Sequence, residues 1–223
     1  MRISLLYGLF CLLTALLFLL SLFTGSVDIP MTAVLDILGG GQGENPGWNY
    51  IVEDRLSRSV VAVGAGSGLA VAGLLMQTLF RNPLAGPGVL GVSSGASLGV
   101  AVALLAPGLF AVGSIGLVLP GILGALGVLL VILWVSRIFR DPASVLITGL
   151  MISSFTSAAV SILLKNAGEA QTQQYIFWGF GSYAGVTMST AWWITGVIIA
   201  VSIGIWTFSR GLDMLLLGDE QAT

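Results

Sequence analysis

Histidine is absent from this 223-residue chain, and cysteine occurs once, as Cys11. The lack of histidine excludes a His-containing metal site, and a single cysteine excludes a disulfide framework within the chain. We find no Ser/His/Asp, Cys/His or paired-carboxylate arrangement suited to catalysis. The sequence therefore predicts neither an enzyme nor a protein that binds a metal ion or another cofactor with its own side chains.

Charged residues are scarce, at 8% of the chain against 56% hydrophobic residues, and the mean hydropathy is +1.02. These values lie far outside the range of soluble globular domains, so the sequence predicts an all-α polytopic protein of the lipid bilayer. The 8 basic and 10 acidic residues give a net charge of -2. Without a basic surface, nucleic acid is excluded as a partner.

Charge is also missing from the predicted membrane interior. Between Arg58 and Arg137 the only charged residue is Arg81, and none occurs at 143–164 or 170–209. Ion-coupled carriers usually place Asp, Glu or His inside the bilayer, so a secondary transporter is disfavoured. A G-x-x-x-x-G-K-[ST] phosphate loop is lacking too. If the protein moves a substrate uphill, a separate ATP-binding subunit must hydrolyse the nucleotide.

Apolar segments long enough to cross a membrane organise the chain into one transmembrane domain over residues 1–223. The expected segments are 3–23, 56–80, 89–105, 115–135, 143–164 and 191–208, followed by a cytoplasmic tail at 209–223. No A-x-A-like cleavage site follows the first segment, so we expect a retained helix rather than a secretory signal. The polar stretches 25–54 and 171–190 are each expected to hold a short interfacial helix, the first near 31–38.

Basic residues favour a cytoplasmic N-terminus in a multi-pass protein of the cell (inner or plasma) membrane. With six crossings, five basic residues fall inside and three outside. The inside set is Arg2, Arg81, Arg137, Arg140 and Arg210, and the outside set is Arg55, Arg58 and Lys165. The two external arginines run against this trend, so they need a structural partner, such as Glu53 or Asp54, or a function.

Proline and glycine interrupt the apolar pattern most strongly between Arg81 and Gly99. The prolines lack a backbone donor and the glycines tolerate positive φ, so we expect the chain to turn here on the cytoplasmic side. The expected turn residues are Asn82, Pro83, Gly86, Pro87 and Gly88.

Three further glycines, Gly91, Gly95 and Gly99, then recur every four residues. This spacing predicts one helical face without side chains, on which another helix can pack closely. We expect the face to serve packing rather than substrate contact.

The motifs between residues 55 and 97 are specific enough to identify a family. Arg55-Leu-Ser-Arg58, Ala72-Gly-Leu-Leu-Met-Gln77 and Arg81-Asn-Pro-Leu-Ala-Gly-Pro-Gly-Val-Leu-Gly-Val-Ser-Ser-Gly95 closely resemble the FecCD-type permeases of ATP-binding-cassette importers for ferric siderophores, haem and vitamin B12. Looser similarities follow at 175–182 and 212–222. Such permeases have ten helices, so the resemblance implies a fragment, a truncated product or half of a split subunit.

The resemblance implies that Arg55 and Arg58 lie on the external face and form salt bridges to glutamates of an extracytoplasmic substrate-binding protein. Exposed charges of this kind steer association and fix register. The alternative is that both arginines anchor the end of the helix and pair with Glu53 and Asp54.

The resemblance also implies that the cytoplasmic turn at 141–144 narrows the pore. The candidate path residues are Pro142, Ala143, Ser144, Thr148 and Met151. Pro142 is equally well explained as the first-turn proline of a helix. Thr148 and Met151, with Ser154 and Ser161, recur near helical spacing; they either line the path or form hydrogen bonds between helices.

The tail at 211–220 is similar to the element that fits a groove in the ATPase. The candidate coupling residues are Leu215, Leu216, Leu217, Gly218 and Glu220. Alternatively, the three leucines belong to a helix resting on the membrane interface.

Taken together, the resemblance implies a permease subunit of an ATP-driven importer for iron-siderophore complexes, with vitamin B12 or haem as alternative substrates. It would form half of the path in a homo- or heterodimer, with two ATP-binding subunits and one extracytoplasmic binding protein. The rival hypothesis is a non-transporting truncated remnant. The sequence does not specify which chelate is carried.

Overall fold

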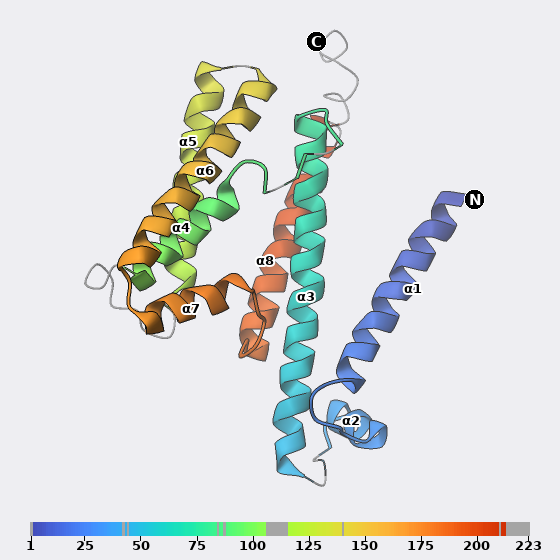
Figure 1. The fold of residues 1–223 in the computed structure, drawn as a ribbon. Coiled ribbons are helices and arrows are strands. Elements are labelled where there is room, and N and C mark those ends of the chain that lie inside the picture. Colours follow the sequence, from blue (N-terminus) through green and yellow to red (C-terminus); the bar gives the residue numbers. More distant parts are fainter. Residues whose placement is uncertain are drawn as a thin grey trace. The chain divides into compact units, whose positions relative to one another are not determined.

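The computed structural model is built of helices and turns, with no strand among the residues that it describes (Figure 1). It describes residues 2–41, 43, 45–83, 85–86, 88–105, 116–139, 141–209 and 211–212, apart from the side chains of residues 2, 3 and 142. The helices are α1 (Arg2–Phe23), α2 (Met31–Leu38), α3 (Pro46–Leu79), α4 (Val92–Leu105), α5 (Val118–Ile138), α6 (Pro142–Asn166), α7 (Glu169–Gly179) and α8 (Met188–Thr207). The predicted all-α class is confirmed.

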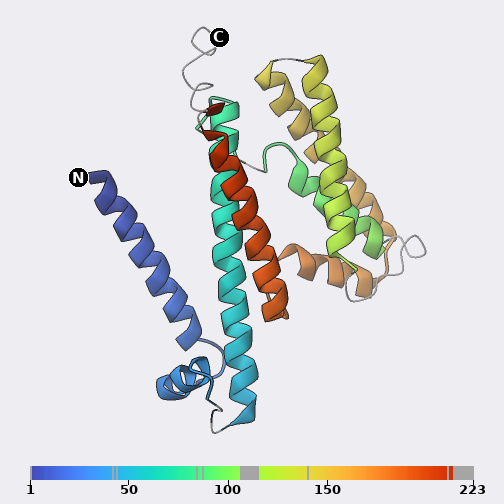
Figure 2. The same ribbon diagram turned by 180° about the vertical axis from the view of Figure 1, so that it is seen from behind.

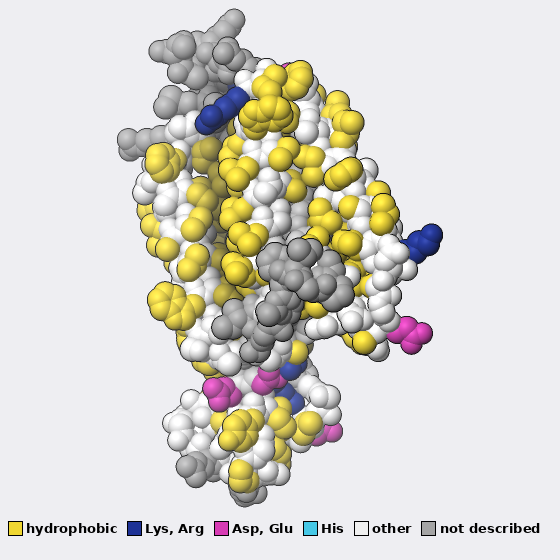
Figure 3. All heavy atoms as spheres, turned by 90° about the vertical axis from the view of Figure 1, so that its left-hand side faces the viewer, with side chains coloured by type: hydrophobic (Ala, Val, Ile, Leu, Met, Phe, Trp, Pro, Cys, Tyr) yellow, Lys and Arg dark blue, Asp and Glu magenta, His cyan; other side chains and the backbone are white. Residues whose placement is uncertain are grey.

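Five described helices, α1, α3, α5, α6 and α8, are long and apolar enough to cross a membrane. The expected number of six is therefore approximate, because α4 has 14 residues and a bilayer-crossing helix needs about 20. Large apolar side chains on these helices are widely exposed, and hydrophobic side chains predominate on the face shown in Figure 3. Such a surface suits lipid as the surrounding solvent.

Helix α3 begins at Pro46, well before the expected start at residue 56. Polarity excludes residues 46–58 from the bilayer core but does not prevent a helix, and proline is well suited to a first helical turn. At 1.5 Å per residue, the 34 residues of α3 extend about 50 Å, against about 30 Å of hydrocarbon core. We therefore expect the charged first turns of α3 to project beyond the membrane and the uncharged stretch from Ser59 to cross it.

The chain forms two compact units, and the first comprises Met1–Gly68 with Tyr183–Thr207. In this unit Ile29, Val34 and Val52 form a buried cluster that joins α2 to the first turns of α3. Helices α3 and α8 lie side by side (Figures 1 and 2). The Thr195 side chain of α8 packs directly against the α3 backbone, because a Cβ added at Gly64 would lie 2.5 Å from Thr195 Oγ1.

The second unit comprises Leu69–Ser182 with Phe208–Thr223, and its centre is α4. Helices α5, α6 and α7 pack around α4, so Val100 and Ala101 are fully buried. A second buried cluster, built around Leu90, Val128 and Val145, joins the start of α4 to α5 and α6. Enclosure by protein explains how a helix too short to span the bilayer fits in this unit.

Candidate functional site

Arg55 and Arg58 occupy different environments on α3. Arg55 is 8% exposed, and its guanidinium donates to the carbonyl oxygens of Leu22, at 3.0 Å, and of Val27. Arg58 is exposed, and its guanidinium lies 2.6 Å from the carboxylate of Asp54. Of the two carboxylates expected as anchors, Asp54 pairs with Arg58, whereas Arg55 binds main-chain oxygens. Docking by this pair stays a prediction.

The predicted turn lies between α3 and α4, and Asn82, Pro83 and Gly86 are part of it. It is closed by backbone hydrogen bonds from Asn82 to Gln77 and from Val89 to Gly86. Pro87 lies outside the described residues. The positive φ expected of the two turn glycines occurs instead at Arg81 (46°) and Gly91 (74°), at either end of the turn.

The glycine face is divided between two neighbouring helices. Gly95 and Gly99 lie on α4 against α5, and a Cβ at Gly95 would lie 2.5 Å from the carbonyl oxygen of Gly124. Gly91 precedes α4 and faces α6, where its Cβ would lie 2.8 Å from the oxygen of Gly149. The expectation of three glycines on one face is therefore wrong for Gly91, because the chain reaches helical geometry only after it.

Glycines on the neighbouring helices complete this packing pattern, and sequence reasoning missed them. Gly124 on α5 and Gly149 on α6 each sit where the backbone of the α4 segment passes. Their presence in neighbouring apolar segments was a readable signal for close helix packing.

The candidate inner constriction is the capped start of α6. Asp141 accepts hydrogen bonds from the backbone N–H of Ser144, at 3.1 Å, and from its hydroxyl, at 3.0 Å. The Ser144 N–H and then its hydroxyl hold the pKa of the exposed Asp141 carboxyl below its usual value. Pro142 lies in the first turn of α6, as expected of a helix-starting proline, and Ala143 is exposed.

The hydroxyls farther along α6 bond within their own helix. Thr148, Ser154 and Ser161 each donate to the carbonyl oxygen four residues earlier. Among the described residues these hydroxyls thus donate within α6, and their hydrogen bonding to other helices stays a prediction. Met151 is 68% exposed on this helix. A role of Thr148 and Met151 in the path stays a prediction.

Sequence reasoning missed a polar pocket of about 320 Å³ in the second unit. Its lining residues are Ser93, Ser94, Ser97, Thr156, Ser157, Val160 and Tyr175. The hydroxyl oxygens of Ser97 and Tyr175 lie 2.6 Å apart, which ties α7 to α4. The helical spacing of the serines could have predicted one polar helix face. The contribution of Tyr175 could not have been predicted, because its helix was expected only to rest at the membrane interface.

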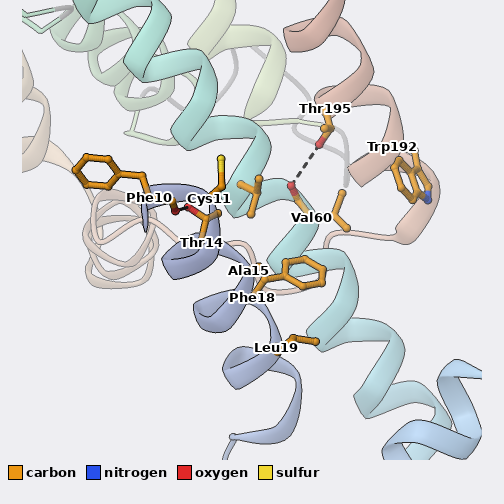
Figure 4. A pocket seen from close by; sticks show the side chains of 10 residues that line it. Phe10, Cys11, Thr14, Ala15, Phe18, Leu19, Val60, Trp192 and Thr195 are labelled. Atoms are coloured by element: carbon orange, nitrogen blue, oxygen red, sulfur yellow. Dashed lines mark hydrogen bonds between the residues drawn. The ribbon is translucent and has the colours of Figure 1, made fainter. Parts of the chain in front are cut away.

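In the first unit, a groove of about 710 Å³ lies between α1, α3 and α8 (Figure 4). Its walls are largely apolar, with Phe10, Phe18 and Trp192 among the lining residues. The Thr195 hydroxyl donates to the Val60 carbonyl oxygen at 3.4 Å beside it. The described residues that line the groove carry no charge.

Comparison with known proteins gives a match to the FecCD transport family over residues 13–223. The chain belongs to the FecCD transport family. This match covers nearly the whole chain, and it confirms the resemblance seen in the motifs between residues 55 and 97.

Curated relatives of this FecCD chain include two kinds of importer permease. It is 32% identical over 205 residues to the vitamin B12 import system permease protein BtuC of Escherichia coli, covering 88% of this chain and 62% of the relative. It is 36% identical over 180 residues to the hemin transport system permease protein HmuU of Yersinia pestis, covering 78% and 53%. The chain thus spans less than two thirds of the relatives' length.

A solved structure supports the same fold. It is an inward-facing conformation of a metal-chelate type ABC transporter, with a TM-score of 0.78 and 28% identity. The match covers 98% of this chain and 66% of the other.

The FecCD chain's candidate coupling residues, Leu215, Leu216, Leu217, Gly218 and Glu220, lie outside the described residues. Among the described residues no cluster of three or more His, Cys, Asp or Glu side chains is placed to hold a metal ion.

Proposed function

We propose that this chain is a permease subunit of an ATP-driven importer for iron-siderophore complexes. The observation that carries the proposal is the family match over residues 13–223. The related permeases are named for vitamin B12 and hemin, and the similar solved structure for a metal chelate. These cargoes are all large chelated metals, so vitamin B12 and haem are the alternative substrates within the same mechanism.

The subunit forms half of the translocation path and pairs with a second permease copy. ATP hydrolysis is carried out by a separate ATP-binding subunit, which the tail at 215–220 contacts. The absence of charge from residues 59–79 and 143–164 supports a path that moves its cargo without a coupling ion. Partner binding then switches the path between outward- and inward-open states.

An extracytoplasmic binding protein delivers the cargo and docks at the projecting first turns of α3. In this orientation the N-terminus is cytoplasmic, and the start of α6 lies at the inner end of the path. Pro142, Ala143, Ser144, Thr148 and Met151 then border that end.

The test is co-purification of the permease with its ATP-binding subunit and binding protein, followed by ATP hydrolysis in proteoliposomes. Ferric siderophore, cyanocobalamin and hemin are compared as ligands of the binding protein. We expect hydrolysis to rise with the ferric siderophore. If only cyanocobalamin or only hemin stimulates hydrolysis, that ligand becomes the proposed substrate in place of the ferric siderophore. An assembled complex with no ligand response would favour a non-transporting remnant.

A further inference from the structure

The polar pocket between α4, α6 and α7 has no role in the function proposed above. We propose that it is a binding site for water, and that this water makes the attachment of α7 to α4 exchangeable. Water molecules in the pocket take over the hydrogen bonds of Ser97 and Tyr175 when these two hydroxyls separate. The site needs no partner outside the chain, so it stands or falls independently of the importer function.

The pocket is lined in the same way by two helices. On each of α4 and α6 the lining residues occupy positions i, i+1 and i+4, which span about 100° of the helix circumference. They are Ser93, Ser94 and Ser97 on α4 and Thr156, Ser157 and Val160 on α6, and α7 adds Tyr175. Every described lining residue except Val160 bears a hydroxyl, and none bears a charge.

Several of these hydroxyls have hydrogen-bonding capacity to spare. Those of Ser93 and Ser94 make no hydrogen bond within the described part of the chain. Thr156 and Ser157 both donate to the carbonyl oxygen of Ser153, at 3.0 Å and 2.8 Å, so their own oxygens can still accept. The pocket thus offers free donors at the start of α4 and free acceptors on α6.

Water is the ligand that fits this set of groups, because it both donates and accepts. A carboxylate would require a charged partner, which the described lining lacks, and an acyl chain would leave the hydroxyls of Ser93 and Ser94 unpaired. The volume of about 320 Å³ is many times the ~10–15 Å³ that one water requires. Ser93 is exposed and Thr156 is buried, so the pocket runs from an open mouth to a closed end.

The bond that ties α7 to α4 lies inside this pocket. The hydroxyl oxygens of Ser97 and Tyr175 are 2.6 Å apart, and both residues line the pocket. In dry apolar surroundings, separating them would leave two unpaired hydroxyls, which is costly. Neighbouring water replaces the lost bond on each side, at little enthalpic cost. Helix α7 therefore separates from α4 more readily than it would from a dry contact.

The first measurement is solid-state NMR of the full chain in nanodiscs, with polarisation transferred from water protons or from lipid acyl protons to labelled serine and tyrosine side chains. We expect transfer from water to Ser94 and Tyr175. Ser202 is the control, because it is half-buried on α8 and bonds within its own helix; it should receive none from water. Transfer to Ser94 and Tyr175 from lipid alone, or from neither source, would overturn the proposal.

The second measurement is hydrogen exchange of the α7 amides. The double variant Ser93→Ala with Ser94→Ala removes two groups that hold the water. Separation of Tyr175 from Ser97 then becomes more costly, so we expect exchange in α7 to slow about threefold.

Ser154→Ala is the matched control for hydrogen exchange. It removes a hydroxyl that bonds within α6 and does not line the pocket, so α7 exchange should not change. Faster α7 exchange in the double variant would show that Ser93 and Ser94 only stabilise the fold, which would contradict the exchangeable attachment. If the double variant does not fold, the transfer from water in the wild type still decides whether the pocket binds water.

Discussion

The close approach of the α5 backbone to α4 explains why residue 95 is a glycine. An added Cβ would lie 2.5 Å from the carbonyl oxygen of Gly124. This distance is too short for a normal contact, so the backbone would have to move. We expect Gly95→Ala to destabilise the protein by about 1–3 kcal/mol, as overpacking does. Thermal unfolding of the detergent-solubilised permease measures the change.

Gly127 provides the matched control, because a Cβ added there meets no atom within 4 Å. Gly127→Ala should be neutral or slightly stabilising, since alanine favours a helix over glycine by about 1 kcal/mol. Equal unfolding temperatures for the two variants would contradict the close packing of α4 on α5. A stable Gly95→Ala complex with altered substrate preference would place this face in the path instead.

The capping carboxyl of Asp141 predicts that the stability of the start of α6 depends on pH. Hydrogen bonds from Ser144 lower the pKa of its carboxyl in the folded state, so this stabilisation is present above the unfolded pKa, about 4, and is lost as the pH falls through the folded value. Asp141→Asn keeps a capping side chain without the titration. Below about pH 4, the unfolding temperature of the wild type should therefore fall relative to that of Asp141→Asn. A constant difference from pH 7 to about pH 3 would contradict the cap as the source.

At the scale of elements, helix α7 is tied to α4 by the hydroxyls of Tyr175 and Ser97, 2.6 Å apart. Tyr175→Phe keeps the ring against the buried cluster of α4 and removes this bond, so we expect a loss of about 0.5–1.5 kcal/mol and faster hydrogen exchange in α7. Ser97→Ala should give a similar loss, and the two losses should not add, because they remove the same bond. Additive losses would show that the two hydroxyls act independently.

The control for this cycle is Tyr183→Phe. The Tyr183 side chain is 43% exposed, and its hydroxyl makes no hydrogen bond within the described part of the chain. Its replacement should leave α7 exchange unchanged.

Apolar runs and their proline or glycine boundaries predicted most elements, including α2 at residues 31–38. They failed at α3, because polarity marks where a helix leaves the membrane and not where it ends. They also failed for Gly91, whose contacts depend on the local backbone. Burial of Arg55 was unpredictable, since it depends on carbonyls that reach the guanidinium only once α1 and α3 have met.

At the scale of the whole molecule, the sequence predicted the membrane class and the family from composition and a few motifs. The proposed function depends on proposed partners outside this chain, namely an ATPase, a binding protein and a second permease copy. The sequence does not specify the substrate, because uncharged membrane segments present few groups that select one chelate.

The most direct measurement of the central claim is ligand-dependent ATP hydrolysis by the permease assembled with its ATP-binding subunit and binding protein in proteoliposomes. We predict a rise in hydrolysis when the binding protein carries ferric siderophore, and no rise with the empty binding protein. The rise should be reduced in Arg58→Gln. Hydrolysis that does not respond to the loaded binding protein in a fully assembled complex would contradict the importer function.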